Sequence, residues 1–147
     1  MKKRGKTLIV LVVDDDLESV ENDRRTLETE YAVLTAACGE EALRIARDAE
    51  PAVIVLDVMM AGGKDGFAVF RELSYDPATR TIPIIFQTAV NQAMGVSFGV
   101  KDVGRYLGRE PAAVLEKPVA PDTLLKTVSR VSARHALRKR GNERDVS

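Results

Sequence analysis

Three consecutive aspartates, Asp14, Asp15 and Asp16, end an apolar run that begins at Leu8 and reads LIVLVVDDD. At an effective dielectric near 20, two carboxylates about 5 Å apart repel each other by roughly 3 kcal/mol. A cluster of this kind therefore needs a positively charged partner. Carboxylates with no His or Cys nearby suit a hard divalent cation, and Mg²⁺ is preferred where phosphate is handled.

Three further chemically capable residues also stand at or near the ends of apolar runs. Asp57 follows AVIVL, Thr88 ends IPIIFQT, and Lys117 comes shortly after AAVL. An ammonium and a hydroxyl directed at one point suit an anion with several oxygens, such as a phosphoryl group. Aspartates that become aspartyl-phosphates are an established mode of covalent catalysis. Phosphoryl transfer asks mainly for in-line positioning and charge neutralisation, which Mg²⁺ and Lys supply.

The elements that would position these residues alternate along the chain. The predicted strands are Leu8–Val13, Ala32–Ala36, Ala52–Leu56, Ile82–Thr88 and Ala112–Leu115. Helical spacing of apolar residues predicts helices over Leu17–Glu30, from Gly39, around Phe67–Leu73 and from Pro121. Such alternation predicts an α/β fold with a parallel sheet covered by helices on both faces. Ligands of such sheets bind at the carboxyl ends of the strands, where the residues named above converge.

Composition narrows the class of protein. The 147 residues are sufficient for one domain, with 45% apolar and 30% charged residues and a formal net charge of zero. Nothing in this balance favours nucleic acid or an anionic membrane. The single cysteine, Cys38, excludes an intramolecular disulfide and favours the cytoplasm. No apolar stretch approaches the roughly 18 residues of a membrane span.

Both ends of the chain are basic or polar. Residues 1–6 read as a solvated N-terminal extension, and residues 134–147 read as a basic and polar C-terminal tail that ends in a disordered GNERDVS. His135 lies in this tail, so we expect it on the surface. Residues 7–133 form the predicted domain.

From Thr7 to Ser132 the chain resembles the receiver domains of two-component response regulators. The resemblance rests on VVDDD, PAVIVLDVMMAGGKDGF, IPIIFQTA and LEKPV, which occur in this order at predicted strand ends. It implies a flavodoxin-like (βα)5 fold, with a doubly wound, five-stranded parallel sheet in the strand order 2-1-3-4-5.

The resemblance also implies a Mg²⁺ site. Asp15 would be a direct ligand and Asp14 would bind largely through water. Asp57 and the backbone carbonyl of Met59 would complete the protein's contribution. Asp16 is only a neighbour in this scheme, and its position suits an N-cap of the following helix.

The phosphoryl group would bind at the same place. Asp57 would be the phosphoacceptor, attacking a phosphohistidine on a sensor histidine kinase or phosphotransfer protein. Thr88 would donate a hydrogen bond to the phosphoryl group and Lys117 would pair with it, with the Lys117–Pro118 peptide bond in the cis form.

Several positions depart from the family pattern. The loop after Asp57 has Ala61 in the usual proline position, followed by Gly62 and Gly63. Thr88 and Lys117 are 29 residues apart, more than is usual, and four glycines lie between them. We therefore expect a shortened or irregular fourth helix within residues 91–111.

Two more departures concern output and lifetime. Val114 replaces the usual aromatic switch residue, for which Tyr106 is the candidate substitute. Met59 and Val90 occupy the positions that tune hydrolysis, and because neither can orient a water molecule we expect slow autodephosphorylation.

The favoured function is a phosphorylation-dependent switch that catalyses only its own phosphorylation and dephosphorylation and controls an unidentified protein partner. The alternative is a receiver-like interaction module that is never phosphorylated. A hydrolase would need a second acid where Met59 stands, which disfavours that class. The sequence leaves open whether the domain stands alone or forms part of a longer protein, and whether it forms a homodimer through its last helix.

Overall fold

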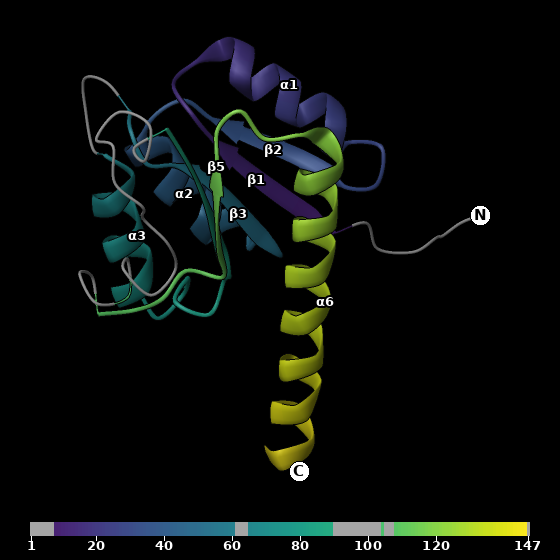
Figure 1. The fold of residues 1–147 in the computed structure, drawn as a ribbon. Coiled ribbons are helices and arrows are strands. Elements are labelled where there is room, and N and C mark those ends of the chain that lie inside the picture. The colour runs from purple at the N-terminus through teal and green to yellow at the C-terminus, as the bar shows by residue number, and fades with distance from the viewer. Residues whose placement is uncertain (1–7, 61–64, 90–103, 105–107, 147) are drawn as a thin grey trace.

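The computed structural model describes residues 8–60, 65–89, 104 and 108–146 of the chain. Its centre is one parallel sheet (Figure 1). The strands are β1 (Ile9–Val13), β2 (Ala32–Ala36), β3 (Val53–Asp57), β4 (Ile84–Thr88) and β5 (Ala113–Glu116). Their order, β2-β1-β3-β4-β5, confirms the predicted doubly wound topology.

Helices cover both faces of this sheet. They are α1 (Leu17–Leu27), α2 (Gly39–Ala49), α3 (Gly66–Tyr75) and α6 (Pro121–Val146). Helices α2 and α3 pack on one face, and α1 and α6 pack on the other (Figure 1). The sheet is thus the middle layer of three, which explains why its central strands are almost wholly apolar.

The period of two residues along each strand divides the core into two parts. Leu11 and Val13 of β1 pack with Leu43 and Phe70 on the α2/α3 face. Val10 and Val12 pack with other apolar residues on the α1/α6 face. Every residue of β3 and β4 is buried, so these two strands form the rigid centre that carries the site.

The C-terminal segment differs from the sequence-based expectation. Helix α6 continues through Val146, so residues 134–146, expected as a separate tail ending in disorder, are helical (Figure 1). The physical reason is composition, because Ala, Leu, Arg, Lys and Glu, which recur in this segment, are good helix formers. His135, expected on the surface, is half-buried.

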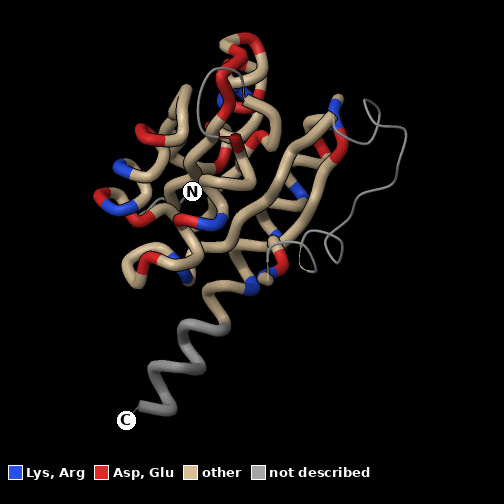
Figure 2. The backbone as a smooth tube through the Cα atoms, turned by 90° about the vertical axis from the view of Figure 1, so that its left-hand side faces the viewer, with Lys and Arg blue, Asp and Glu red and all other residues tan. Residues whose placement is uncertain are grey.

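Two segments in which the sequence departs from the family pattern lie outside the described residues, wholly or for the most part. They are the loop from Ala61 to Gly63, and the region of the expected fourth helix with Val90 and Tyr106. Over the described part of the chain, acidic and basic residues are interspersed (Figure 2). None of the helices there has both the length and the apolar character needed to cross a membrane.

Candidate functional site

Two buried aspartates stand at the carboxyl ends of the central strands. Asp14 follows β1, and its backbone N–H donates to the carbonyl of Ala36, while Asp57 is the last residue of β3. Their side chains are 2% and 6% exposed, respectively, which is far below the usual exposure of a carboxylate. The parallel register of β1 and β3 brings these two strand ends side by side.

A lysine lies between the two carboxylates. Lys117 follows β5, and its Nζ lies 2.9 Å from Asp14 Oδ2 and 3.4 Å from Asp57 Oδ1. Its backbone N–H donates to the carbonyl of Thr88 at 2.9 Å, which fixes the start of its loop against the end of β4. The Lys117–Pro118 bond is cis, as predicted.

The third carboxylate is that of Asp15. One oxygen from each of Asp14, Asp15 and Asp57 lies within 4.8 Å of the other two. Three carboxylates without His or Cys form an oxygen-only set, which fits Mg²⁺ and suits softer metals poorly. The predicted metal residues are therefore brought together, and the Met59 carbonyl as a further ligand stays a prediction.

The electrostatics of this cluster are unfavourable without a cation. Burial, together with the negative charge of Asp14, raises the pKa of Asp57 to about 6, against the opposing effects of Lys117 and of the Met59 N–H. Burial alone would lower the pKa of Lys117, but its hydrogen bond to Asp14 and the charge of Asp57 raise it overall. One ammonium thus does not balance three carboxylates, and a divalent cation would.

Thr88 occupies the end of β4 and is completely buried. Its strand is the neighbour of β3, and its carbonyl holds the Lys117 backbone, so it belongs to the same edge of the sheet. The structure thus brings together Asp14, Asp15, Asp57 and Lys117 directly and places Thr88 beside them.

Local sequence features hold these strand ends in place. Asp16 caps α1, accepting hydrogen bonds from the Glu18 N–H and the Ser19 hydroxyl, as its position predicted. Gly66 opens α3 directly against the end of β3, and a Cβ there would lie 2.3 Å from the Asp57 carbonyl oxygen. Only glycine fits this close approach.

Sequence reasoning missed two polar residues next to this cluster. Gln87 of β4 is 3% exposed and is the register partner of Asp57, and Asp23 of α1 faces it. A glutamine inside the otherwise apolar run IPIIFQT was the available signal. Asp23 gave no signal, because a polar residue in a surface helix is normally solvated.

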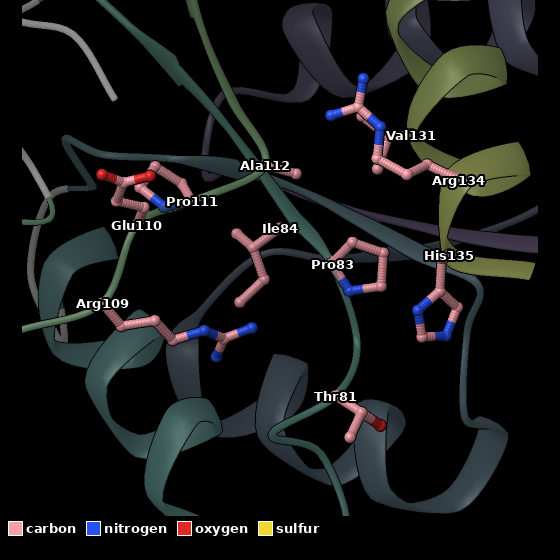
Figure 3. Close-up of a pocket in the computed structure, with 10 residues that line it drawn as sticks. All are labelled: Thr81, Pro83, Ile84, Arg109, Glu110, Pro111, Ala112, Val131, Arg134 and His135. Carbon is pink, nitrogen blue, oxygen red and sulfur yellow. The ribbon is translucent and has the colours of Figure 1, made fainter. Parts of the chain in front are cut away.

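A hollow of about 400 Å³ lies at the amino-terminal ends of the strands, at the edge of the sheet opposite the carboxylate cluster (Figure 3). Pro83, just before β4, and Ile84, the first residue of β4, face Val131 and His135 of α6 across this hollow. Arg109 closes one side of it. The Arg109 guanidinium donates to Ser74 Oγ and the Ile82 carbonyl and lies 5.2 Å from the centre of the Phe70 ring. This pocket contains none of the predicted site residues.

Comparison with known proteins agrees with this geometry. Residues 10–129 match the family model described as the response regulator receiver domain. Protein PilH of Pseudomonas aeruginosa is 33% identical over 125 residues, which cover 84% of this chain and 97% of PilH. Response regulator PleD of Caulobacter vibrioides is 41% identical over 102 residues, which make up 63% of this chain and only 21% of PleD.

Solved structures show the same similarity. The chemotaxis response regulator CheY4 of Vibrio cholerae superposes with a TM-score of 0.71 at 33% identity, covering 86% of this chain and 99% of CheY4. A putative response regulator from Chloroflexus aurantiacus gives a TM-score of 0.73 at 31% identity, covering 87% of this chain and 99% of its own. Fold, site and sequence together show that the chain belongs to the response regulator receiver domain family.

Proposed function

We propose that this receiver domain acts in two-component signalling by accepting a phosphoryl group on Asp57 and releasing it slowly. Phosphorelay signalling itself follows from the family to which the chain belongs. The observation that carries the residue-level proposal is the convergence of Asp14, Asp15, Asp57 and Lys117 at one edge of the sheet. The ends of three strands, β1, β3 and β5, supply these side chains, and no single motif would place them together.

The chemistry assigned to Asp57 is nucleophilic attack. A carboxylate oxygen of Asp57 forms a bond to phosphorus while the bond from phosphorus to the donor's imidazole nitrogen breaks, and the electron pair leaves with that nitrogen. Mg²⁺ held by Asp14, Asp15 and Asp57 would neutralise charge on the phosphoryl oxygens. Lys117 supplies a second positive charge, and its position 3.4 Å from Asp57 Oδ1 places it beside the reacting carboxylate.

Ionisation of Asp57 is part of this scheme. A protonated carboxyl is a poor nucleophile, and burial with the charge of Asp14 raises the pKa of Asp57 to about 6. A divalent cation beside the carboxyl lowers that pKa by favouring the charged form. The residues that hold the metal thus also prepare the nucleophile.

The partners follow from this chemistry. The donor is a histidine kinase or a phosphotransfer protein, and the receiver of the signal is a protein that distinguishes the two phosphorylation states. The domain is a phosphoacceptor that promotes only its own phosphorylation and dephosphorylation. We place this activity in the cytoplasm, where such kinases act.

The direct test is the intact mass of the protein after incubation with acetyl phosphate and Mg²⁺. We expect a gain of one phosphoryl group that disappears when Mg²⁺ is chelated. Asp57→Asn should remove the gain, whereas Asp48→Asn, which neutralises an exposed carboxylate on α2, should leave it intact.

A folded protein that gains no mass from acetyl phosphate and does not bind beryllofluoride would contradict the proposal. That result would favour the alternative, an interaction module that works without phosphorylation. A gain that persists in Asp57→Asn would mean that another residue is the acceptor.

A further inference from the structure

A second hollow of about 310 Å³ lies beside the carboxylate cluster, between α1 and the ends of β4 and β5. Ser19, Asn22 and Asp23 line it from α1, and Gln87, Lys117 and Val119 line it from the sheet side. Lys117 therefore borders two sites. One is the carboxylate cluster, where its ammonium lies now, and the other is this side pocket.

The polar atoms of the side pocket are incompletely bonded. Gln87 is 3% exposed, and its carboxamide faces the Asp23 carboxyl closely enough to lower the pKa of that group. Nevertheless, Asp23 Oδ2 and Gln87 Nε2 are buried without a hydrogen-bond partner among the described residues. Asp23 Oδ2 is a hydrogen-bond acceptor and Gln87 Nε2 is a donor. A buried acceptor without a donor is rare and costly, so Asp23 Oδ2 points to a donor group that reaches it in another state of the protein.

The charges indicate which group that is. The Asp23 carboxyl has its pKa raised to about 6, chiefly by burial and further by Asp14, while Lys117 acts in the opposite direction. A desolvated carboxylate favours a cation. Of the described residues that line the side pocket, Lys117 is the one that carries a positive charge.

Lys117 needs such a partner once a divalent cation is bound. Its ammonium now shares Asp14 Oδ2 and Asp57 Oδ1, which belong to the cluster that would hold the metal. Two cations on the same carboxylates repel each other, and a half-buried ammonium without a counter-charge is destabilising. The lysine stem is flexible and its head has three donors, so it can turn to new acceptors without moving the backbone.

We propose that the side pocket is a second binding position for the Lys117 ammonium, in which the Asp23 carboxylate accepts a hydrogen bond from it and the neighbouring Gln87 orients that carboxylate, while the carboxylate cluster holds a divalent cation and no phosphoryl group is present. Asp23 and Gln87 are then positioning residues that act through Lys117. They keep it close to the site, ready to pair with an incoming phosphoryl group. This inference rests on the proposed metal site.

Calorimetric titration with Mg²⁺ tests the inference without any phosphoryl donor. Asp23→Asn keeps the shape of the side chain and removes its charge, and we expect it to weaken Mg²⁺ binding about three- to tenfold, because Lys117 then stays on the metal's carboxylates. Gln87→Leu should weaken binding in the same direction and by less. Asp48→Asn is the matched control and should leave the affinity unchanged.

A Lys117→Met background separates this indirect effect from a direct one. Lys117→Met alone should tighten Mg²⁺ binding, because a competing cation has been removed. In that background we expect Asp23→Asn to change the affinity by less than about twofold. A purely structural role for Asp23, or a direct attraction between Asp23 and the metal, would give the same loss with and without the lysine.

The outcomes distinguish this inference from the proposed function. If the wild-type protein binds Mg²⁺ and Asp23→Asn has no effect, or has an equal effect in the Lys117→Met background, the second lysine position is wrong and the metal site stands. If the wild-type protein binds no Mg²⁺, the metal site fails and the inference fails with it.

Discussion

The two faces of the sheet use the same strands but differ where those strands end. On the α2/α3 face the core stays apolar up to β4. There the centre of the Phe86 ring lies 5.1 Å from the centre of the Phe70 ring and 5.6 Å from that of the Phe67 ring. On the α1/α6 face, Val12 and Val55 are followed two residues later by Asp14 and Asp57. The α2/α3 face is packed with apolar side chains up to the carboxyl ends of the strands, whereas the α1/α6 face changes to charged groups at those ends.

A shift of one residue along a strand therefore changes the role of a side chain. Phe86 and Gln87 are neighbours in β4 and both are at most 3% exposed, yet one fills the apolar core and the other borders the site. The alternation of side chains along a strand produces this separation. It lets the carboxylate cluster carry unfavourable charge while the apolar core below it and the core on the opposite face supply the free energy that keeps the domain folded.

The largest loss in the free energy of unfolding is expected from Phe86→Ala. It removes a completely buried ring that contacts two other rings, and we expect a loss of about 3–5 kcal/mol in the free energy of unfolding. Urea unfolding followed by circular dichroism measures it. The neighbouring Gln87→Leu should change stability by less than about 1 kcal/mol, because it replaces an amide whose Nε2 has no described partner. Equal losses would show that the two faces are not separated as described.

Gly66→Ala should have the next largest effect. The added Cβ would lie 2.3 Å from the Asp57 carbonyl oxygen and 2.6 Å from Val58 Cα, and these are backbone atoms that cannot move aside cheaply. We expect a loss of about 2–3 kcal/mol and slower phosphorylation by acetyl phosphate, because the end of β3 must shift.

Gly104→Ala is the matched control for this substitution. Its added Cβ meets chiefly the Glu110 side chain, with Cγ at 2.5 Å, and that chain can rotate away. We expect a change in stability of less than about 1 kcal/mol. If both alanine variants lost equal stability, the close approach of α3 to β3 would not be the cause.

The fold and most of the site could be predicted because strong local patterns encode them. Continuous apolar runs marked strands covered on both faces, and the parallel topology then required Asp14, Asp57 and Lys117 to share an edge. Asp16 was recognisable as a helix cap for the same reason, since capping depends on neighbours in the sequence.

The remaining features depend on contacts between distant segments. The close approach of Asp23 to Gln87 brings α1 against β4, and no periodicity distinguishes Asp23 from the solvated residues around it. The length of α6 was underestimated because a charged sequence without an apolar stripe reads equally well as a tail or as an extended helix.

A smaller effect should appear in the pH dependence of stability. The pKa of Asp23 is raised from 3.8 to about 6, by burial first and by Asp14 second, with Lys117 opposing. The folded state therefore binds this proton more tightly than the unfolded state. Its stabilising contribution is full at acidic pH, below the unfolded pKa, and is lost as the pH rises through about 6.

Asp23→Asn should remove this loss. We expect the variant to gain about 1 kcal/mol relative to wild type between acidic and neutral pH, after allowance for the partial solvent screening of Asp23. Urea unfolding of both proteins in the absence of Mg²⁺ measures the difference. Asp57 titrates in both proteins, so its contribution cancels in the difference between them. Parallel pH curves would mean that Asp23 is as well solvated in the folded protein as in the unfolded chain.

The smallest effect on stability, with a clear effect on function, is expected from Met59→Asn. The Met59 side chain is 61% exposed, two residues after Asp57, and its replacement should change the free energy of unfolding by no more than about 0.5 kcal/mol. Methionine cannot orient a water molecule by hydrogen bonding, whereas the amide of asparagine can both donate and accept. Phosphorylated Met59→Asn should therefore lose its phosphoryl group several times faster than wild type, as followed by intact mass after removal of acetyl phosphate. Met59→Leu keeps an apolar side chain of similar size and should stay slow. If the asparagine and leucine variants lost their phosphoryl groups at the same rate, water positioning at Met59 would not control the lifetime. The slow hydrolysis would then be due to the buried groups around Asp57 rather than to the exposed Met59 side chain.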